Sequence, residues 1–279
     1  MTNHEPAGGA DALVEVVGQG VRVIDLGRPY AVGMPKSPNH AAYTHTLQRR
    51  HGDVVRADGG SAANDLIVLG THVGTHIDAL AHISHNGLLH GGHDAAAEQI
   101  GGRFERGGVQ DFAPFVGRAV LLDIPGLLGV AACPAAYAVT ANDLAAAAAR
   151  QRTRIGAGDV VLVRTGWGSH WDDHDRYIGA ATGVPGPDAD AAEWLAGREV
   201  RAAGSDTIAF EHIPAGVGHA SLPVHRILLV DNGINIIETL DLDRLAAERV
   251  YEFVLVLSPL HLTGATGAPV RPLALTSAR

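Results

Sequence analysis

Cysteine is almost absent from the sequence, which contains only Cys133 among its 279 residues. A disulfide within one chain needs two cysteines, so a disulfide framework is excluded and a reducing, cytoplasmic location is expected. Long apolar runs are absent too, and no stretch approaches the roughly 20 residues of a membrane-spanning helix. The first residues lack the basic start and apolar middle of a secretory signal peptide, which agrees with the cytoplasmic expectation.

Positive charge is scarce as well. Lys and Arg number 21 against 30 Asp and Glu, so the formal net charge is -9. Proteins that bind nucleic acid gather Lys and Arg in clusters, and this sequence has no such cluster. We therefore expect neither nucleic acid nor a membrane as a partner. A composition of 46% hydrophobic and 18% charged residues is that of an ordinary globular chain.

No internal repeat or low-complexity linker divides the chain. Residues 1–20 are small and polar enough to form a loosely held N-terminal arm, and residues 21–279 are expected to form one domain. Alternating strand and helix patterns in the second half predict an α/β fold. The expected strands are residues 21–26, 65–69, 119–124, 159–164, 207–210, 234–237 and 252–257. The expected helices run from a cap at Thr140 or Asn142 to Arg152 and over residues 188–202, 223–230 and 240–248, while residues 27–60 are expected to be irregular.

Histidine is the residue that the sequence has in excess. Six of the 16 histidines fall between positions 72 and 93, far more than a uniform spread would place there. Imidazole nitrogens and a carboxylate oxygen are the ligands that zinc prefers, and they also suit manganese and iron. The segment His72-Val73-Gly74-Thr75-His76-Ile77-Asp78 therefore predicts a metal site. The alternative is a chance cluster whose imidazoles cap turns or lie on the surface.

The spacing of this segment requires a bend. In a straight strand, His72 and Asp78 would lie about 20 Å apart, too far to share one ion. In a helix, His72 and His76 would meet, but Asp78 would point elsewhere. A bent loop brings all three together, because Gly74 permits the bend and the Thr75 hydroxyl can tie the turn.

The same segment, with His82 four residues after Asp78, resembles the H-x-G-T-H-x-D-x-x-x-H signature of the cyclase-like metal hydrolases. This family includes bacterial kynurenine formamidase and isatin hydrolase. The usual signature has proline two residues after the aspartate; this chain has Leu80 there, and a related branch reads D-A-L-A-H, as here. Residues 223–238 resemble the family's P-x-H…I-x-I-x-E segment, and residues 259–271 resemble its P-L-x-L…G-x-P-V-R ending. The resemblance runs from about residue 20 to 275.

The resemblance implies a swivelling β/β/α fold with a mixed sheet, a homodimer, and specific roles at the site. His72, His76 and Asp78 correspond to metal ligands, and His82 corresponds to the general acid/base. The two-zinc formamidases add a histidine and a glutamate, which here would be His225 and Glu238. The gap between those two is one residue longer here, so the turn around residues 231–233 must absorb an insertion. Isatin hydrolases work with a single manganese, so one or two Zn²⁺ or Mn²⁺ ions are expected.

The implied activity is hydrolysis of an amide-type C–N bond, in an aryl formamide or a cyclic amide, by metal-activated water. The resemblance leaves open a lactone hydrolase or a polyketide-type cyclase. A non-catalytic metal-binding protein is the alternative from another class, and it predicts a closed set of ligands. The expected partner is a small molecule, an aromatic amide, lactam or lactone.

Other candidates have weaker signals. Trp167 follows an expected strand and is expected either to line a substrate pocket or to pack in the core. Glu211 and His212 also follow an expected strand and lie either near the site or in solvent. Nothing near Cys133 suggests an activated thiol, and no G-x-S-x-G motif supports a serine hydrolase. A Gly-rich loop holds three histidines expected in a lid or in solvent, His85, His90 and His93.

Overall fold

The computed structural model describes residues 8–278, and its centre is a nine-stranded mixed sheet. In order across the sheet, the strands are β1 (Val21–Asp25), β15 (Leu273–Ser277), β13 (Glu252–Leu257), β7 (Phe115–Asp123), β9 (Val160–Arg164), β11 (Ala202–Ser205), β12 (Asn235–Glu238), β4 (His76–Asp78) and β14 (Gly267–Pro269). The four strands from β7 to β12 run parallel to one another. The strands outside them pair antiparallel. The expected α/β class with a mixed sheet is confirmed.

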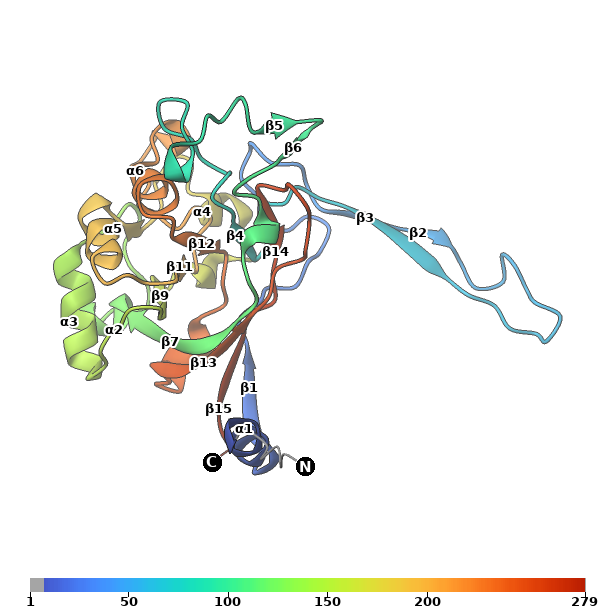
Figure 1. The fold of residues 1–279 in the computed structure, drawn as a ribbon, viewed down its shortest axis with the longest axis horizontal. Coiled ribbons are helices and arrows are strands. Elements are labelled where there is room, and N and C mark those ends of the chain that lie inside the picture. Colours follow the sequence, from blue (N-terminus) through green and yellow to red (C-terminus); the bar gives the residue numbers. More distant parts are fainter. Residues whose placement is uncertain (1–7, 279) are drawn as a thin grey trace, which may run out of the picture.

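Helices cover one face of this sheet, and the sheet curls over its other face. Figure 1 shows α3 (Ala141–Gln151), α5 (Ala189–Ala196) and α6 (Pro223–His225) along one side. Their apolar side chains form one core with Val161, Val163 and Ile236. A second core combines residues of β7 and β9 with Ile24 of β1 and Ala274 of β15, so the outer strands wrap around it. Because β9 is covered on both faces, it is a continuous Val/Leu run.

The remaining helices have between five and 11 residues. They are α1 (Gly8–Gly18), α2 (Ile124–Leu128), α4 (His174–Ile178) and α7 (Asp243–Ala247), with a π-helical turn at Arg226–Asp231 and 3₁₀ turns at His90–Gly92, Val109–Asp111, Trp167–His170 and Gly218–Ala220. The expected cap of α3 is confirmed, because Thr140 and Asp143 form a capping box. Among residues 8–278, no helix is long and apolar enough to cross a membrane.

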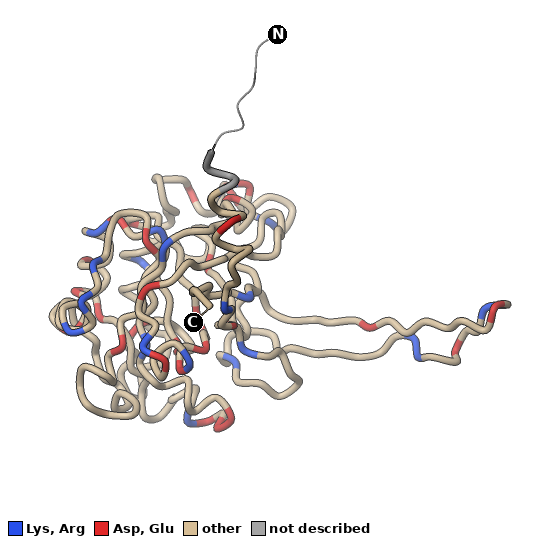
Figure 2. Tube along the Cα trace, turned by 90° about the horizontal axis from the view of Figure 1, so that it is seen from below, with Lys and Arg blue, Asp and Glu red and all other residues tan. Residues whose placement is uncertain are grey.

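A long hairpin leaves the body of the molecule. Strands β2 (Thr44–Arg49) and β3 (Asn64–Val68) pair antiparallel, and all their residues are exposed. Figures 1 and 2 show this hairpin extending well beyond the other elements, with charges of both signs toward its tip. Two smaller pairs are β5 (Gln99–Ile100) with β6 (Arg103–Phe104), and β8 (Ala138–Val139) with β10 (Gly186–Pro187).

Three expectations about secondary structure need correction. The strand expected at residues 207–210 lies instead at Ala202–Ser205, where small residues fit between neighbours; a Cβ at Gly204 would lie 3.0 Å from Ile237. Ile208 and Phe210 are buried in a turn, which explains why they look like a strand. The helix expected at 188–202 ends at Ala196, because Gly197 caps it there, and β11 begins at Ala202. Residues 27–60, expected to be irregular, contain β2.

The N-terminal arm is only partly described. Residues 1–7 lie outside the described residues, whereas Gly8–Gly18 form helix α1 beside β1. Leu13, Val14, Val16 and Val17 of this helix are exposed. A loosely held arm that ends at residue 20 stays a prediction, as does the boundary of the domain there.

Candidate metal centre

The predicted bend in the His72–Asp78 segment is confirmed. Gly74 has a φ of 67°, and a Cβ there would lie 2.8 Å from the Tyr30 ring, so both conformation and space require glycine. The Thr75 hydroxyl donates to the Thr239 carbonyl at 2.7 Å and accepts from the Arg28 backbone N–H at 2.8 Å. These bonds fix the bend immediately before β4 begins at His76.

Asp78 is the centre of a buried cluster. His72 Nδ1 lies 2.6 Å from Asp78 Oδ1, and His76 Nε2 lies 3.4 Å from the same oxygen. His76 Nδ1 is 2.8 Å from the Gly74 carbonyl, which directs its other nitrogen toward the carboxylates. The three residues predicted from the motif therefore meet.

The second half of the cluster comes from the segment about 150 residues later. Glu238 is the partner of His76 in the register of β12 and β4, and its Oε2 lies 3.4 Å from His76 Nε2. His225, in α6, places Nε2 3.2 Å from Glu238 Oε1 and 3.6 Å from Asp78 Oδ2. The structure thus brings both residues into the cluster. The π-helical turn at Arg226–Asp231 lies between them, and its wider bonding accommodates one more residue than an α-helical turn.

His82 lies against the same cluster. Its ring stacks on that of His72, with centroids 3.9 Å apart and planes at 25°. The candidate ligand atoms of His72, Asp78 and His82 lie within 4.8 Å of one another, as do those of His76, Asp78 and Glu238. This geometry is compatible with His82 as a ligand or as a proton-transfer group, so its general acid/base role stays a prediction.

The carboxylates and imidazoles shift one another's pKa values. Burial alone would lower the pKa of His76, but the carboxylates of Asp78 and Glu238 outweigh it and raise this pKa to about 10. Burial would raise the pKa of Asp78, but the imidazoles of His82 and His72 hold it well below its ordinary value. The cluster therefore favours positive charge between its carboxylates, which a protonated imidazole or a divalent cation can supply.

His82 behaves differently. Burial lowers the pKa of His82 to about 3, although the Asp78 carboxylate acts in the opposite direction. His82 is therefore neutral near pH 7, and a pKa this low also makes its ring a weaker base than an ordinary imidazole. The ordinary value near 6.5, expected from the sequence, is not retained at this position.

Three atoms show that the cluster fits a metal ion. Within residues 8–278, His76 Nε2, Asp78 Oδ2 and Glu238 Oε1 are buried and make no well-aligned hydrogen bond, although oppositely charged groups lie 3.2–3.6 Å away. Buried polar atoms are nearly always paired, because an unpaired one loses its hydration without compensation. All three belong to a single cluster of nitrogen and oxygen donors, the donor set of Zn²⁺ and Mn²⁺.

Two neighbours of His72 carry no signal in the sequence motif. The ring of His40 stacks on that of His72 with centroids 5.3 Å apart, and Thr266 Oγ1 lies 2.9 Å from His72 Nε2. Glu211, whose place was open, lies against His225, and its Oε1 is 2.6 Å from His225 Nδ1. Partners this distant in sequence become visible only when the chain is folded.

The loop histidines have positions outside the cluster. His90 Nδ1 lies 2.9 Å from the Val230 carbonyl, so this side chain attaches the Gly-rich loop to the π-helical turn. His93 Nδ1 is 4.0 Å from a Glu98 oxygen, and the backbone of His85 pairs with that of Leu88. These contacts indicate that the three histidines stabilise the conformation of the Gly-rich loop.

Trp167 and Cys133 are both buried. The Trp167 indole N–H donates to the Tyr177 carbonyl at 2.9 Å, within a separate apolar cluster. This is a packing environment, and contact of Trp167 with substrate stays a prediction. Burial raises the pKa of the Cys133 thiol to about 12, which agrees with the expectation that it is no nucleophile.

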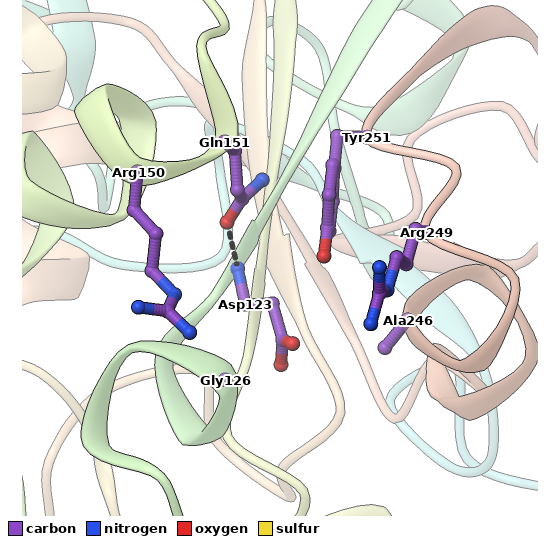
Figure 3. Close-up of a pocket in the computed structure, with 7 residues that line it drawn as sticks. All are labelled: Asp123, Gly126, Arg150, Gln151, Ala246, Arg249 and Tyr251. Atoms are coloured by element: carbon purple, nitrogen blue, oxygen red, sulfur yellow. Dashed lines mark hydrogen bonds between the residues drawn. The ribbon is translucent and has the colours of Figure 1, made fainter.

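A cavity of about 520 Å³ lies elsewhere and shares no lining residue with the cluster. Figure 3 shows Arg150 and Arg249 on opposite sides of it, with Tyr251 and Asp123 between them. The Asp123 carboxylate already pairs with Arg164 at 2.8 Å. This cavity contains no histidine, cysteine or unpaired carboxylate that could start metal chemistry.

Comparisons with known sequences find two similarities. The model of a family described as "Putative cyclase" matches residues 24–212. Isatin hydrolase from Roseibium aggregatum is 28% identical over 263 residues, which cover 93% of this chain and 89% of that protein.

Two solved structures are similar over nearly the whole chain. A crystal structure of a novel cyclase has a TM-score of 0.84 and 29% identity, covering 95% of this chain and 93% of that one. An isatin hydrolase bound to the product analogue thioisatinate has a TM-score of 0.75 and 25% identity, covering 97% of this chain and 98% of that one. The large curled mixed sheet is therefore an architecture that this chain shares with them.

Proposed function

This chain belongs to the cyclase family, and from this membership we propose that it is a metal-dependent hydrolase of an amide-type C–N bond, in an aryl formamide or a cyclic amide. One observation carries the proposal. Among residues 8–278, three buried atoms that can bind a metal make no well-aligned hydrogen bond and converge on one point, in a chain that is related to isatin hydrolase over 93% of its length.

We propose that His72, His76 and Asp78 hold the metal, with His225 and Glu238 as further ligands. Asp78 belongs to both groups of candidate donors, so its carboxylate would take part whether the site held one ion or two. Zn²⁺ and Mn²⁺ both suit this mixture of imidazole and carboxylate. One or two ions per chain are proposed on this basis.

When bound, the metal polarises the scissile carbonyl and makes water a stronger nucleophile near neutral pH. The neutral His82 ring accepts the proton that the attacking water loses and then delivers it to the leaving nitrogen. Asp78 and Glu238 keep negative charge beside the imidazoles. His40, stacked on His72, borders the same side of the cluster.

The substrate is proposed to be a small aromatic amide or lactam, because the related isatin hydrolase has such a substrate in its name. A cytoplasmic homodimer is proposed on the family resemblance and the single cysteine. The exposed β2–β3 hairpin offers such a dimer a surface to bury.

Ring closure is the second candidate function, and similarity to a structure described as a novel cyclase favours it. Activation of a carbonyl at the same cluster would serve a cyclase or a lactone hydrolase equally well. The choice between them depends on which nucleophile reaches the carbonyl.

A substrate screen tests the proposal. Protein loaded with Zn²⁺ or with Mn²⁺ is assayed against isatin, N-formylkynurenine, and simple lactams and lactones, beside Asp78→Ala as control. We expect hydrolysis of at least one C–N substrate, with loss on chelation and in the control. The proposal of a metal-dependent hydrolase would be overturned if elemental analysis found no transition metal and chelation left the activity unchanged. Turnover of lactones alone would favour the lactone hydrolase.

A further inference from the structure

Glu211 is a buried carboxylate whose hydrogen bonds go to one short helix, α6. Its side chain is 1% exposed. Oε1 lies 2.6 Å from His225 Nδ1 and accepts the His225 backbone N–H at 2.9 Å, while Oε2 accepts the Val224 backbone N–H at 3.2 Å. Among residues 8–278, every hydrogen bond of this carboxylate thus goes to α6, two of them to His225, a candidate ligand, and one to Val224 beside it.

The backbone around Glu211 is held in an unusual conformation. Phe210, the residue before it, has a φ of 57°, which is rare for a bulky side chain and is tolerated only where packing enforces it. Gly186 packs directly against this turn, because a Cβ there would collide with the Phe210 carbonyl oxygen. The His212 N–H donates to the Pro187 carbonyl at 2.9 Å. Strand β10 therefore holds the turn that directs Glu211 toward His225.

This contact selects which nitrogen of His225 faces the cluster. When Nδ1–H donates to Glu211, Nε2 carries the lone pair, and Nε2 is the atom beside Glu238 and Asp78. His76 has the same arrangement with a neutral partner, the Gly74 carbonyl. Carboxylate partners of metal-binding histidines fix the ring and increase its basicity.

We propose that Glu211 is a positioning residue that orients His225 toward the metal and strengthens it as a ligand. This inference rests on the proposed metal centre. A simpler role exists, since the same carboxylate also satisfies two backbone N–H groups in the first turn of α6. Such a cap would stabilise the fold without affecting the metal, so the test must measure metal binding apart from stability.

Two variants and one control separate the roles. E211A removes the carboxylate, whereas E211Q keeps its shape and an oxygen acceptor but removes the charge. The control is D206N, because Asp206 is an equally buried carboxylate that accepts backbone N–H groups of Thr165 and Gly166 at 2.8 Å, and within residues 8–278 the hydrogen bonds of its side chain go to residues 165–168 and to no candidate ligand. Affinity for Zn²⁺ and for Mn²⁺ is measured by competition with a chelating dye, and folding by circular dichroism and thermal unfolding.

We expect E211A to bind both ions about 10- to 100-fold more weakly than wild type, the usual effect of losing such a partner. E211Q should lie between E211A and wild type. D206N should lower the unfolding temperature and leave metal affinity unchanged. In NMR spectra, the His225 Nδ1–H proton, shifted downfield by its short hydrogen bond, should disappear in E211A.

Two results would count against the inference in different ways. If folded E211A and E211Q both bind metal within about twofold of wild type, far less than such a partner is worth, Glu211 is only a cap and the proposed hydrolase stands. If wild type binds neither ion, the metal centre and this inference both fall. Should E211A fail to fold, the comparison of E211Q with D206N decides the question.

Discussion

Two groups of charged side chains lie at the same edge of the sheet, and they are built differently. The parallel strands β7, β9 and β12 end in Asp123, Arg164 and Glu238. At Arg164, the guanidinium donates to Asp123 and to Asp243, at 2.8 Å each. At Glu238, the carboxylates face imidazoles. Among residues 8–278, three atoms there that can bind a metal are buried without a well-aligned hydrogen bond.

The two groups differ in whether the positive charge beside their carboxylates can be replaced. Arg164 is always protonated and cannot give up its charge, so its carboxylates are permanently paired. An imidazole can lose its proton, and a metal ion can then take the place of that positive charge. The cavity of Figure 3 borders the first group, whereas the proposed chemistry belongs to the second. In this protein, buried charged groups whose partners are missing or can be exchanged are therefore a better guide to function than the volume of a cavity.

The largest contrast is expected between Asp78→Ala and Asp123→Ala, which each remove one buried carboxylate. Asp78→Ala removes the group common to both sets of candidate ligands, so we expect loss of metal and of essentially all activity. Asp123→Ala should keep its metal and most of its activity. Elemental analysis and a steady-state assay of both proteins measure this. Full metal content in Asp78→Ala would contradict the assigned centre.

A smaller but still large effect is expected for His82→Ala. This variant should retain most of its metal and lose about 10²- to 10⁴-fold in kcat, the usual value of a general acid/base. Metal content and kcat measured on the same sample separate the two roles of His82 that the geometry permits. A variant that binds no metal would make His82 a ligand, and one with wild-type kcat would remove it from the mechanism.

For the Arg164 group, we expect a moderate loss of stability when one of its carboxylates is removed. Asp123→Ala leaves a guanidinium that is only 14% exposed with one carboxylate instead of two. We expect the free energy of unfolding to fall by about 1–3 kcal/mol, the cost of an unmet buried hydrogen bond to a charge. Denaturant titration measures it, with Asp123→Asn as the conservative control. A loss of metal in Asp123→Ala would show that the two groups are coupled.

The local part of the site could be predicted from the sequence, because its determinants are adjacent residues. Gly74 and Thr75 specify the bend, and His72, His76 and Asp78 lie within seven positions. His225 and Glu238 entered only through the family resemblance, since their approach depends on the pairing of β12 with β4. That pairing is set by packing across the whole sheet.

The rest of the fold shows the same limit. Expected strands that are continuous apolar runs, such as residues 159–164 and 252–257, appear within a residue of their expected bounds. The strand at Ala202–Ser205 was missed because Ala-Ala-Gly-Ser has low strand propensity, and its place is decided by the narrow space between β9 and β12. Exposed β2 has no buried face and so gives no clear pattern.

The last prediction, for which we expect no effect on metal content, concerns a third group near the same edge, the neutral thiol of Cys133. Its backbone N–H donates to the Thr165 carbonyl at 2.8 Å, one residue beyond Arg164. Burial, with Asp206 nearby, raises the pKa of this thiol to about 12, so the thiolate fraction at pH 8 should be about 10³-fold below that of an exposed cysteine. We expect alkylation of the folded protein to be slower than that of the unfolded chain by at least this factor, and to rise about tenfold per pH unit. Cys133→Ser should abolish labelling without changing metal content. Rapid labelling of the folded protein at pH 8 would show that the Cys133 thiol is accessible and ionises readily. The prediction of a neutral, unreactive thiol would then be wrong.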